Sequence, residues 1–169
     1  MADLRFRLSP LGKEDRSDFT SGSEPLDRYF RSQVGQDIRR QISKRYIASD
    51  SASGAIAGYY TISAASIPVP DIPEDLARRL PRYPEIPAVR LGRLAVDQRF
   101  RGLKLGTALL LHAVLRAATS GIGVHFLIVE AKDAEAQKFY AHHGFIAYGS
   151  AAGRLVAPLR TLLKVSGKD

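Results

Sequence analysis

The chain has 169 residues, about the length of one domain, and 45% of them are hydrophobic, which is enough for a real core. It contains no cysteine, so disulfides, a thiolate nucleophile and a cysteine-based metal site are excluded. The formal net charge of +8 favours a polyanionic partner such as a nucleic acid or a phosphorylated cofactor, with a basic proteome background as the alternative.

The N-terminal residues MADLRFRLSP contain no apolar run of the kind found in a secretion signal, and no stretch resembles a membrane span. We therefore expect a soluble, cytoplasmic protein that makes no contact with a membrane. Residues 1–169 are expected to form a single domain, because no segment looks separately foldable.

The first part of the chain predicts a strand followed by an amphipathic helix. Residues 4–11 alternate apolar and basic side chains, as a half-buried strand does. Ser23 is placed to cap a helix that extends to residue 41, with Pro25 in its first turn. The apolar face of this helix comprises Leu26, Tyr29, Phe30, Val34 and Ile38. Its other face, either solvated charge or a binding surface, carries Arg28, Arg31, Arg39 and Arg40.

The middle of the chain changes in texture after two strands. Residues 42–49 and 55–67 are expected to be strands that flank a turn. Six of the nine prolines then fall in residues 68–87, so this stretch cannot be a long helix or a central strand. We interpret it as a surface excursion of the same domain, with a short helical turn around residues 74–80.

The second half of the chain alternates strands and helices. The expected elements are a strand at 88–97, a helix at 105–121, a strand at 125–131, a helix at 133–145 and a final hairpin of residues 145–150 and 154–165. The first of these helices is apolar on nearly every side, so we expect it to be buried. Asp133 is the N-cap of the second helix and Gly144 follows its end. The whole succession predicts a mixed α/β (α+β) fold with a largely antiparallel start.

The sequence RGLKLG, residues 101–106, connects a predicted strand to a predicted helix. Such a turn directs unpaired N–H groups and the positive end of the helix dipole to one point, which is an anion site. Gly102 and Gly106 permit a tight turn and close approach of a ligand, while Arg101 and Lys104 add positive charge. The turn therefore predicts a pyrophosphate site, with a helix-capping turn that contains incidental glycines as the alternative.

Two ordered motifs resemble the GNAT superfamily of N-acetyltransferases: LGRLAVDQRFRGLKLGTALL and, about thirty residues later, AQKFYAHHGF. In that family a turn Q/R-x-x-G-x-G/A binds the pyrophosphate of acetyl-CoA, and here Arg101, Lys104 and Gly106 stand at its first, fourth and sixth positions. Lys104 replaces the usual glycine, which costs backbone strain if the position needs a positive φ and also offers a phosphate contact. The second signature, A-x-x-F-Y-x-x-x-G-F, is matched by Ala136, Phe139, Tyr140, Gly144 and Phe145.

The resemblance implies a fold and a set of cofactor contacts. The fold is a mixed, mostly antiparallel, twisted sheet with helices on both faces and a splayed central strand pair. The backbone of residues 94–96 is expected to bond the pantetheine arm and to polarise the thioester carbonyl, although these residues are also ordinary core strand residues. The candidate acetyl-CoA contacts are Leu94, Ala95, Val96, Arg101, Gly102, Leu103, Lys104, Leu105, Gly106, Thr107 and Phe139.

Tyr140 is the candidate catalytic residue, because the matching tyrosine protonates the departing thiolate in the family. A phenol with a reference pKa of about 10 is protonated at neutral pH and can protonate a thiolate of reference pKa about 8.5. The alternative is a tyrosine packed for its ring. No general base is identified, since Glu130, Asp133 and Glu135 have no distinctive spacing. The four histidines have no spacing typical of a metal site, so we expect no metal.

Residues 19–48 resemble one GNAT branch, the acetyltransferase toxins of type II toxin–antitoxin systems. This resemblance implies acetylation of the free α-amino group of aminoacyl-tRNA, which stops translation. It also implies a ribbon-helix-helix antitoxin, contact with DNA only through the antitoxin complex, and a homodimer. An α-amino group has a pKa of about 7.7–8.0, so a base is less necessary for it than for a lysine.

An RNA substrate requires cations for its phosphates. The candidates beside the proposed acceptor side are Arg78, Arg79, Arg82, Arg90 and Arg93. The tyrosines that either stack on a base or pack in the core are Tyr29, Tyr59, Tyr60 and Tyr83. Two other functions remain open at this point. One is a GNAT enzyme that acetylates a small amine or a protein or peptide amine, and the other is a non-catalytic GNAT-like module that binds nucleic acid.

Overall fold

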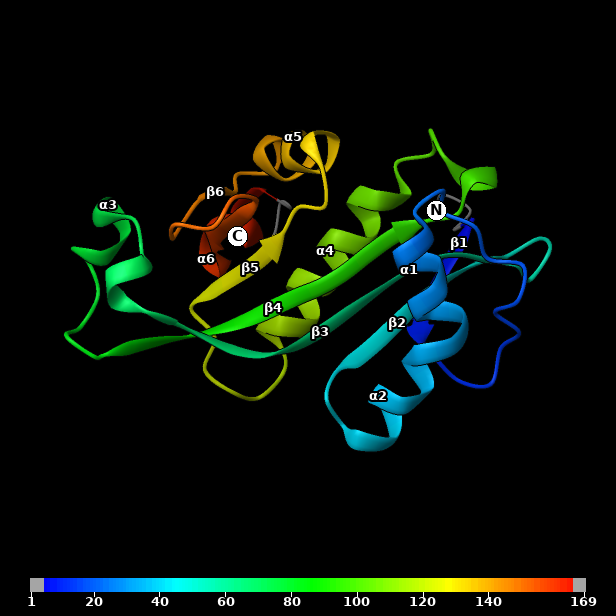
Figure 1. Ribbon diagram of the computed structural model, residues 1–169, viewed down its shortest axis with the longest axis horizontal. Helices are drawn as coiled ribbons and strands as arrows, with labels where there is room; N and C mark the ends of the chain where they lie inside the picture. Colours follow the sequence, from blue (N-terminus) through cyan, green and yellow to red (C-terminus); the bar gives the residue numbers. More distant parts are fainter. Residues whose placement is uncertain (1–4, 166–169) are drawn as a thin grey trace. The chain divides into compact units, whose positions relative to one another are not determined.

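The computed structural model describes residues 5–165, except the side chains of Asp37, Ile38 and Val165 (Figure 1). The chain divides into two compact units. The first unit comprises Met1–Ser63 and Gly92–Ala113, and the second comprises Ala64–Leu91 and Val114–Asp169.

The strands form a mostly antiparallel sheet of seven strands in the order β1-β2-β3-β4-β5-β7-β6. The strands are β1 (Phe6–Pro10), β2 (Lys44–Asp50), β3 (Ile56–Pro68), β4 (Glu85–Val96), β5 (Phe126–Glu130), β6 (Ile146–Ala147) and β7 (Arg154–Pro158). The pairs β1–β2, β2–β3, β5–β7 and β6–β7 are antiparallel. In contrast, β4 and β5 pair in parallel, with Ala88–Leu91 beside Phe126–Val129.

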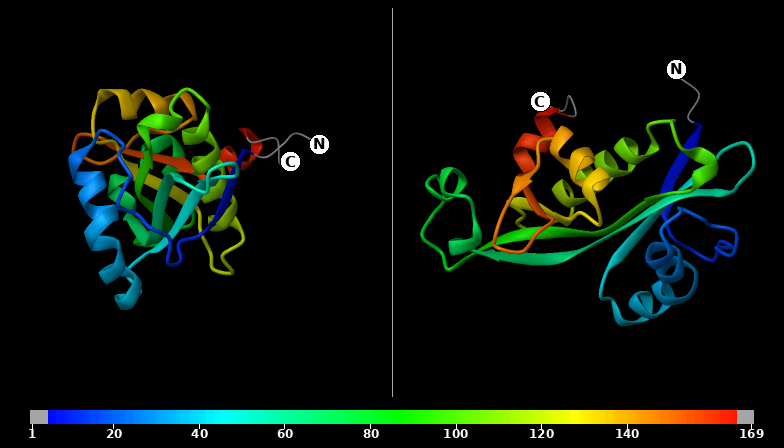
Figure 2. Two further views of the ribbon diagram at one scale, coloured as in Figure 1. Left: turned by 90° about the vertical axis from the view of Figure 1, so that its right-hand side faces the viewer. Right: turned by 45° about the horizontal axis from the view of Figure 1, so that its top comes forward.

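The sequence predicts most of the helical segments, and the structure adds two 3₁₀ turns and a helix at the end of the chain. They are α1 (Glu24–Arg28), the π-helical η1 (Tyr29–Gln33), α2 (Val34–Arg40), the 3₁₀ turn η2 (Val69–Asp71), α3 (Glu74–Ala77), the 3₁₀ turn η3 (Gln98–Phe100), α4 (Leu105–Ala118), α5 (Ala134–His142) and α6 (Leu159–Val165). Figure 2 shows α1, η1 and α2 following one another as one coiled run, which matches the single amphipathic helix predicted there.

Helices cover both faces of the sheet in the first unit. Adjacent residues of a strand point to opposite faces, and Tyr59 and Tyr60 of β3 show this directly. The ring of Tyr59 stacks on Phe30 of η1 at 4.2 Å between centroids, while the hydroxyl of Tyr60 lies 2.6 Å from Nδ1 of His112 in α4. Gly58 faces α4 as well, and a Cβ there would lie 2.9 Å from a methyl group of Leu109. The glycine therefore lets α4 approach the sheet closely.

The predicted α4 is buried on one side rather than all round. Leu105, Leu109 and Leu110 are buried, but Leu115 is 37% exposed. The helix also ends at Ala118, three residues earlier than the sequence predicts. The leucines of α4 therefore do not show which side of the helix faces the core. Some apolar residues lie at the surface, and the sequence does not distinguish them from buried ones.

Strand β4 begins at Glu85, inside the stretch that the sequence assigns to the surface excursion. Ile86 and Ala88 are buried in the core of the second unit, so the strand alternation extends through Pro87. A proline lacks only the N–H donor, and the carbonyl of Pro87 still accepts a bond of 3.0 Å from the amide of His125. The prediction that no central strand reaches into residues 68–87 is therefore wrong at residues 85–87, and also at residue 68, where β3 ends.

The final hairpin is also only partly correct. Strands β6 and β7 pair as predicted, but residues 159–165 form the helix α6. Leu159 and Leu162 are both buried, which is the spacing of one helix face. Pro158 ends the strand, and the amide of Leu159 donates to the carbonyl of His125 at 2.9 Å. The stretch LRTLLKV consists largely of good helix formers, and this is the signal that the hairpin interpretation missed.

Candidate active site

The glycine-containing turn joins β4 to α4 in the first unit. Gly102 has φ of +78° and Lys104 has φ of +62°. The carbonyl of Lys104 accepts from the amide of Ala108 at 3.2 Å, so Lys104 is the residue that caps α4. The turn needs a positive φ at this position, which explains why the family's pattern has glycine there. Lys104 adopts the same φ at a cost in backbone strain.

The residues of this turn fit an anionic phosphate group. The first amides of a helix have no partner within the helix, and α4 is long enough, at 14 residues, for its dipole to favour an anion there. Lys104 is exposed and its ammonium group is carried on the capping residue itself. The predicted contacts Leu103 to Thr107 form the end of this turn and the first turn of α4, and their role in binding acetyl-CoA stays a prediction.

Arg101 is held by a neighbouring loop. Its guanidinium donates to the carbonyl of Ser21 in the loop Thr20–Gly22. Gly22 has φ of +93°, and a Cβ there would lie 2.6 Å from Nε2 of Gln98 and 2.9 Å from Nη2 of Arg101. The loop therefore packs directly on the side chains that precede the glycine turn, and it orients the predicted phosphate ligand Arg101.

Asp97 connects the turn to the same loop, and no sequence pattern predicts this role. The side chain is 1% exposed. Its carboxylate accepts from the amide of Thr20 at 3.0 Å, from the amide of Arg99 at 2.9 Å and from the Arg99 guanidinium at 2.9 and 3.0 Å. Burial by itself would raise the pKa of Asp97, but the bonds from Arg99 and Thr20 hold it below its usual range.

A second buried carboxylate holds the other side of the loop. Asp27 of α1 is 2% exposed and accepts from the amide of Ser21 at 2.9 Å and from its hydroxyl at 2.6 Å. The amide of Gln98 donates to the carbonyl of Thr20 at 2.8 Å. The loop Thr20–Gly22 is thus fixed between α1 and the turn, although it lies far from the turn in sequence.

The end of β4 carries the three residues predicted to bond the pantetheine arm. Ala95 is buried in the cluster with Tyr29, Phe30 and Tyr59, while Leu94 and Val96 are half-buried. The amide of Asp97, which follows them, donates to the carbonyl of Ala57 in β3 at 2.8 Å. These residues therefore pack as ordinary strand residues. The proposed role of their backbone in binding the pantetheine arm stays a prediction.

Tyr140 lies near the end of α5, in the second unit. The helix begins as predicted, with the carboxylate of Asp133 accepting from the amide of Ala136 at 2.8 Å. The Tyr140 ring is 7% exposed and packs edge-on against Phe139 and Phe145, at 5.2 and 5.4 Å between centroids. Burial raises its pKa far above the ordinary value, so the phenol keeps its proton throughout the physiological range.

The remaining residues of the second motif build this environment. Gly144 has φ of +100°, which turns the chain so that the amide of Phe145 donates to the carbonyl of Tyr140 at 3.1 Å. Phe139 is half-buried between Tyr140 and His143. The spacing A-x-x-F-Y-x-x-x-G-F thus corresponds to a helix end that folds one aromatic ring back onto another.

The predicted RNA-contacting arginines are divided between the two units and differ in their surroundings. Arg93, in the first unit, lies over the ring of Tyr29 at 3.5 Å. In the second unit, Arg78 pairs with Asp75, whereas Arg79 lines a hollow beside α6. Arg82 and Arg90 are exposed. Each therefore remains a candidate by itself, and their role stays a prediction.

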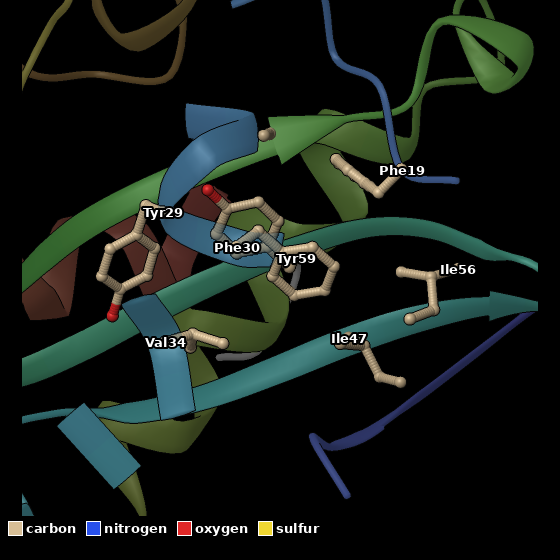
Figure 3. Close-up of a cluster of buried hydrophobic side chains, with 8 residues drawn as sticks. Phe19, Tyr29, Phe30, Val34, Ile47, Ile56 and Tyr59 are labelled. Atoms are coloured by element: carbon tan, nitrogen blue, oxygen red, sulfur yellow. The ribbon is translucent and has the colours of Figure 1, made fainter. Parts of the chain in front are cut away.

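Three of the four candidate stacking tyrosines belong to the core instead. Tyr29, Tyr59 and Tyr60 are buried, and Figure 3 shows the Tyr59 ring against Phe30. The hydroxyl of Tyr59 donates to the carbonyl of Leu26 at 2.7 Å, so even its polar end is used within the fold. Tyr83 differs, because it is 61% exposed.

Two further observations limit the chemistry. Among residues 5–165, no three histidine or acidic side chains come together as a metal site would require. No helix within the same range is long and apolar enough to cross a membrane.

Comparison with known proteins places this fold and these motifs in a family. Residues 45–147 match the acetyltransferase (GNAT) domain family, which is more than half of the chain. The chain belongs to the GNAT acetyltransferases. The predicted fold and the predicted enzyme class, an N-acetyltransferase, are thereby confirmed.

Individual relatives are toxins. The chain is 31% identical to a tRNA-acetylating toxin of Mycobacterium tuberculosis strain H37Rv, over 78% of each chain. A solved structure of AtaT with acetyl-methionyl-tRNAfMet is 28% identical, with a TM-score of 0.84, covering 95% of this chain and 99% of that one. A tyrosine-to-phenylalanine mutant of AtaT, bound to the C-terminus of the antitoxin AtaR and to acetyl-CoA, is 25% identical with a TM-score of 0.79, covering 96% and 98%.

Proposed function

We propose that this chain is an acetyl-CoA-dependent N-acetyltransferase toxin that acetylates the α-amino group of aminoacyl-tRNA and so blocks translation. The observation that carries the chemistry is Tyr140, a buried phenol whose pKa is raised by its apolar surroundings at the end of α5. The substrate is supported by the likeness to a tRNA-acetylating toxin and to AtaT with acetyl-methionyl-tRNAfMet.

The chain's own residues have separable tasks in this reaction. Acetyl-CoA, when bound, supplies an acetyl group activated as a thioester. The amides at the start of α4, with Lys104, hold its pyrophosphate, and the backbone of Leu94–Val96 orients its pantetheine arm. As the amine nitrogen forms its bond to the carbonyl carbon and the carbon–sulfur bond breaks, Tyr140 would donate its phenol proton to the departing sulfur, and the proton that the amine nitrogen releases would restore the phenol.

The positive charge of the chain suits the proposed substrate. Phosphate contacts supply affinity without reading sequence, and the exposed arginines Arg78, Arg79, Arg82 and Arg90 provide such contacts. Arg93 adds a guanidinium above Tyr29.

The partners follow from the same proposal. We infer that a ribbon-helix-helix antitoxin neutralises the enzyme, in keeping with the likeness to AtaT bound to the C-terminus of AtaR. The chain contacts DNA only through the complex with that antitoxin, acts as a homodimer, and works in the cytoplasm where charged tRNA is found.

The proposal is tested by acetyl transfer from radiolabelled acetyl-CoA to a pool of aminoacylated tRNA, with deacylated tRNA and free amino acids as controls. We expect label only in charged tRNA. Label in free amines or proteins alone, with acetyl-CoA binding intact, would contradict the proposed substrate.

Tyr140→Phe separates the catalytic role from the fold. Loss of the proton donor should lower kcat by about 10²-fold or more, while the dissociation constant for acetyl-CoA changes little, because the ring and its packing remain. Tyr83→Phe is the matched control, since that side chain is exposed and removal of its hydroxyl should leave kcat unchanged. If both variants retain most of the transfer rate, Tyr140 is a packing residue only.

A further inference from the structure

A hollow of about 680 Å³ lies in the second unit, beside α3 and α6, and no step of the proposed chemistry uses it. Its volume falls within the range of about 300–1,000 Å³ that is typical of ligand sites. The residues around it are Asp75, Leu76, Arg79, Leu80, His125, Pro158, Arg160, Thr161 and Lys164.

The hollow has an apolar floor and a cationic rim. Leu76, Leu80 and Pro158 are half-buried, and both leucines pack against the core cluster of the second unit, which holds the floor in place. Arg79, Arg160 and Lys164 are exposed, so their charged ends are free to meet a ligand from solvent. A ligand that fits this arrangement combines negative charge with an apolar surface.

Within the part of the chain that the structure describes, none of the three rim cations has an acidic partner. Among the ion pairs of residues 5–165, none includes Arg79, Arg160 or Lys164. The one carboxylate at the rim, Asp75, is already paired with Arg78. Unpaired cations that surround one hollow create a positive potential there and raise the local concentration of an anion.

The two rim residues of α6 are spaced to contact a chain of phosphates. Arg160 and Lys164 are four residues apart, so they project from the same side of the helix, about 6 Å apart along its axis. Arg79 faces the same hollow from the end of α3. A guanidinium binds phosphate through two parallel bonds, while an ammonium acts as a point charge.

We propose that this hollow binds the sugar–phosphate backbone of the RNA substrate, outside the aminoacyl end that reacts. This inference rests on the proposed function. The riboses lie on Leu76, Leu80 and Pro158, and the phosphates contact Arg79, Arg160 and Lys164. Because the three cations contact phosphates, which carry no sequence information, the contact is independent of sequence.

The test is the double charge reversal Arg160→Glu with Lys164→Glu, measured by tRNA binding rather than by activity alone. The dissociation constant for aminoacylated tRNA should rise by about tenfold or more, equally for different tRNAs. The slope of log affinity against log salt should fall by about one to two. The dissociation constant for acetyl-CoA should stay unchanged, because the phosphate turn belongs to the first unit.

The control is Arg116→Glu with Lys132→Glu, which makes the same change in net charge at exposed positions of the same unit away from the hollow. Equal weakening by both double variants would overturn the proposal, because net charge alone would then explain it. Unchanged tRNA binding with weakened neutralisation by the antitoxin would also overturn it, in favour of an acidic peptide. Thermal melting verifies folding, and Arg160→Gln with Lys164→Gln replaces a variant that does not fold.

Failure of the proposed function is recognised separately. A wild-type protein that acetylates no charged tRNA contradicts the proposed reaction, whatever the binding measurements give. Loss of tRNA affinity confined to the α6 variant supports the hollow as an RNA site even then, because binding is measured without transfer.

Discussion

Lys104 is the residue at which this chain departs from its family, and the backbone explains what the departure costs. A residue with a Cβ at φ of +62° is strained by about 1–2 kcal/mol relative to ordinary conformations. Gly102, two residues earlier, has a similar φ of +78° without that strain. The lysine therefore exchanges backbone stability for a cation at the start of α4.

Two substitutions at this position separate strain from charge. Lys104→Ala and Lys104→Gly both remove the ammonium, so both should weaken acetyl-CoA binding to a similar extent, about threefold to tenfold. Only glycine relieves the strain, so the free energy of unfolding should be about 1 kcal/mol higher for Lys104→Gly than for Lys104→Ala. Urea denaturation and calorimetric titration measure the two effects. Equal stability of both variants would show that the positive φ carries no cost.

Asp97 is the residue on which the geometry of the turn depends. Asp97→Asn removes the charge that two Arg99 nitrogens and the Thr20 amide share, so we expect a loss of about 2–3 kcal/mol in the free energy of unfolding. Because Arg101 and the turn are held to the same loop, acetyl-CoA binding should weaken as well. Asp75→Asn, on an exposed pair, is the control and should cost less than about 1 kcal/mol.

The same substitution has a pH signature. The pKa of Asp97 is lower in the folded protein than in the unfolded chain. Its stabilising contribution is therefore complete above the unfolded pKa, about 4, and is lost as the pH falls through the folded pKa. The free energy of unfolding should fall less steeply with decreasing pH in Asp97→Asn than in the wild type. Parallel acid curves would mean that the buried carboxylate does not titrate on unfolding.

At the scale of elements, patterns of neighbouring residues predict most boundaries. The wrong boundaries occur where an element depends on a partner that is distant in the sequence. Asp133 and Gly144 delimit α5 as expected because capping involves neighbouring residues only. In β4, Pro87 is compatible with a strand because its carbonyl accepts a hydrogen bond from the amide of His125. The sequence around Pro87 does not show that this partner exists. In α6, the leucine spacing is consistent with a helix. The sequence interpretation instead continues the preceding strand through these residues as part of a hairpin.

Buried tyrosines in two elements also make the free energy of unfolding depend on alkaline pH. Burial raises the pKa of Tyr59 in β3 and of Tyr140 in α5. Both phenols stay protonated in the folded protein, while the unfolded chain releases their protons above about pH 10. Stability is therefore complete below that pH and falls above it, by about 1.4 kcal/mol per pH unit for each group.

Tyr140→Phe removes one of these groups and should reduce this alkaline slope by about 1.4 kcal/mol per pH unit. Denaturant midpoints between pH 8 and pH 11 measure it, with Tyr83→Phe as the exposed control that leaves the slope unchanged. A slope identical in all three proteins would mean that Tyr140 does not contribute.

At the scale of the whole molecule, the net charge of +8 sets the expected salt dependence. If the substrate is held by its phosphates, kcat/KM for charged tRNA should fall by at least about tenfold between 50 and 200 mM salt. The KM for acetyl-CoA depends on one site and should change less. Initial rates with either substrate held saturating distinguish the two. Equal salt dependence would argue for a small uncharged acceptor instead.

The sequence by itself determined the family and the order of most elements, and it provided two predictions about the site: that the turn of residues 101–106 binds phosphate and that Tyr140 is catalytic. These depend on patterns of neighbouring residues: a helical period, a cap, a glycine turn or a motif of ten residues. Only the tertiary structure decided that Tyr59 is core, that Asp97 is a clamp and that α6 completes a hollow. The Asp97–Thr20 and Arg101–Ser21 bonds join residues 77 and 80 positions apart. Contacts at such separation arise from the packing of whole elements, and neither partner carries a local signal of the other.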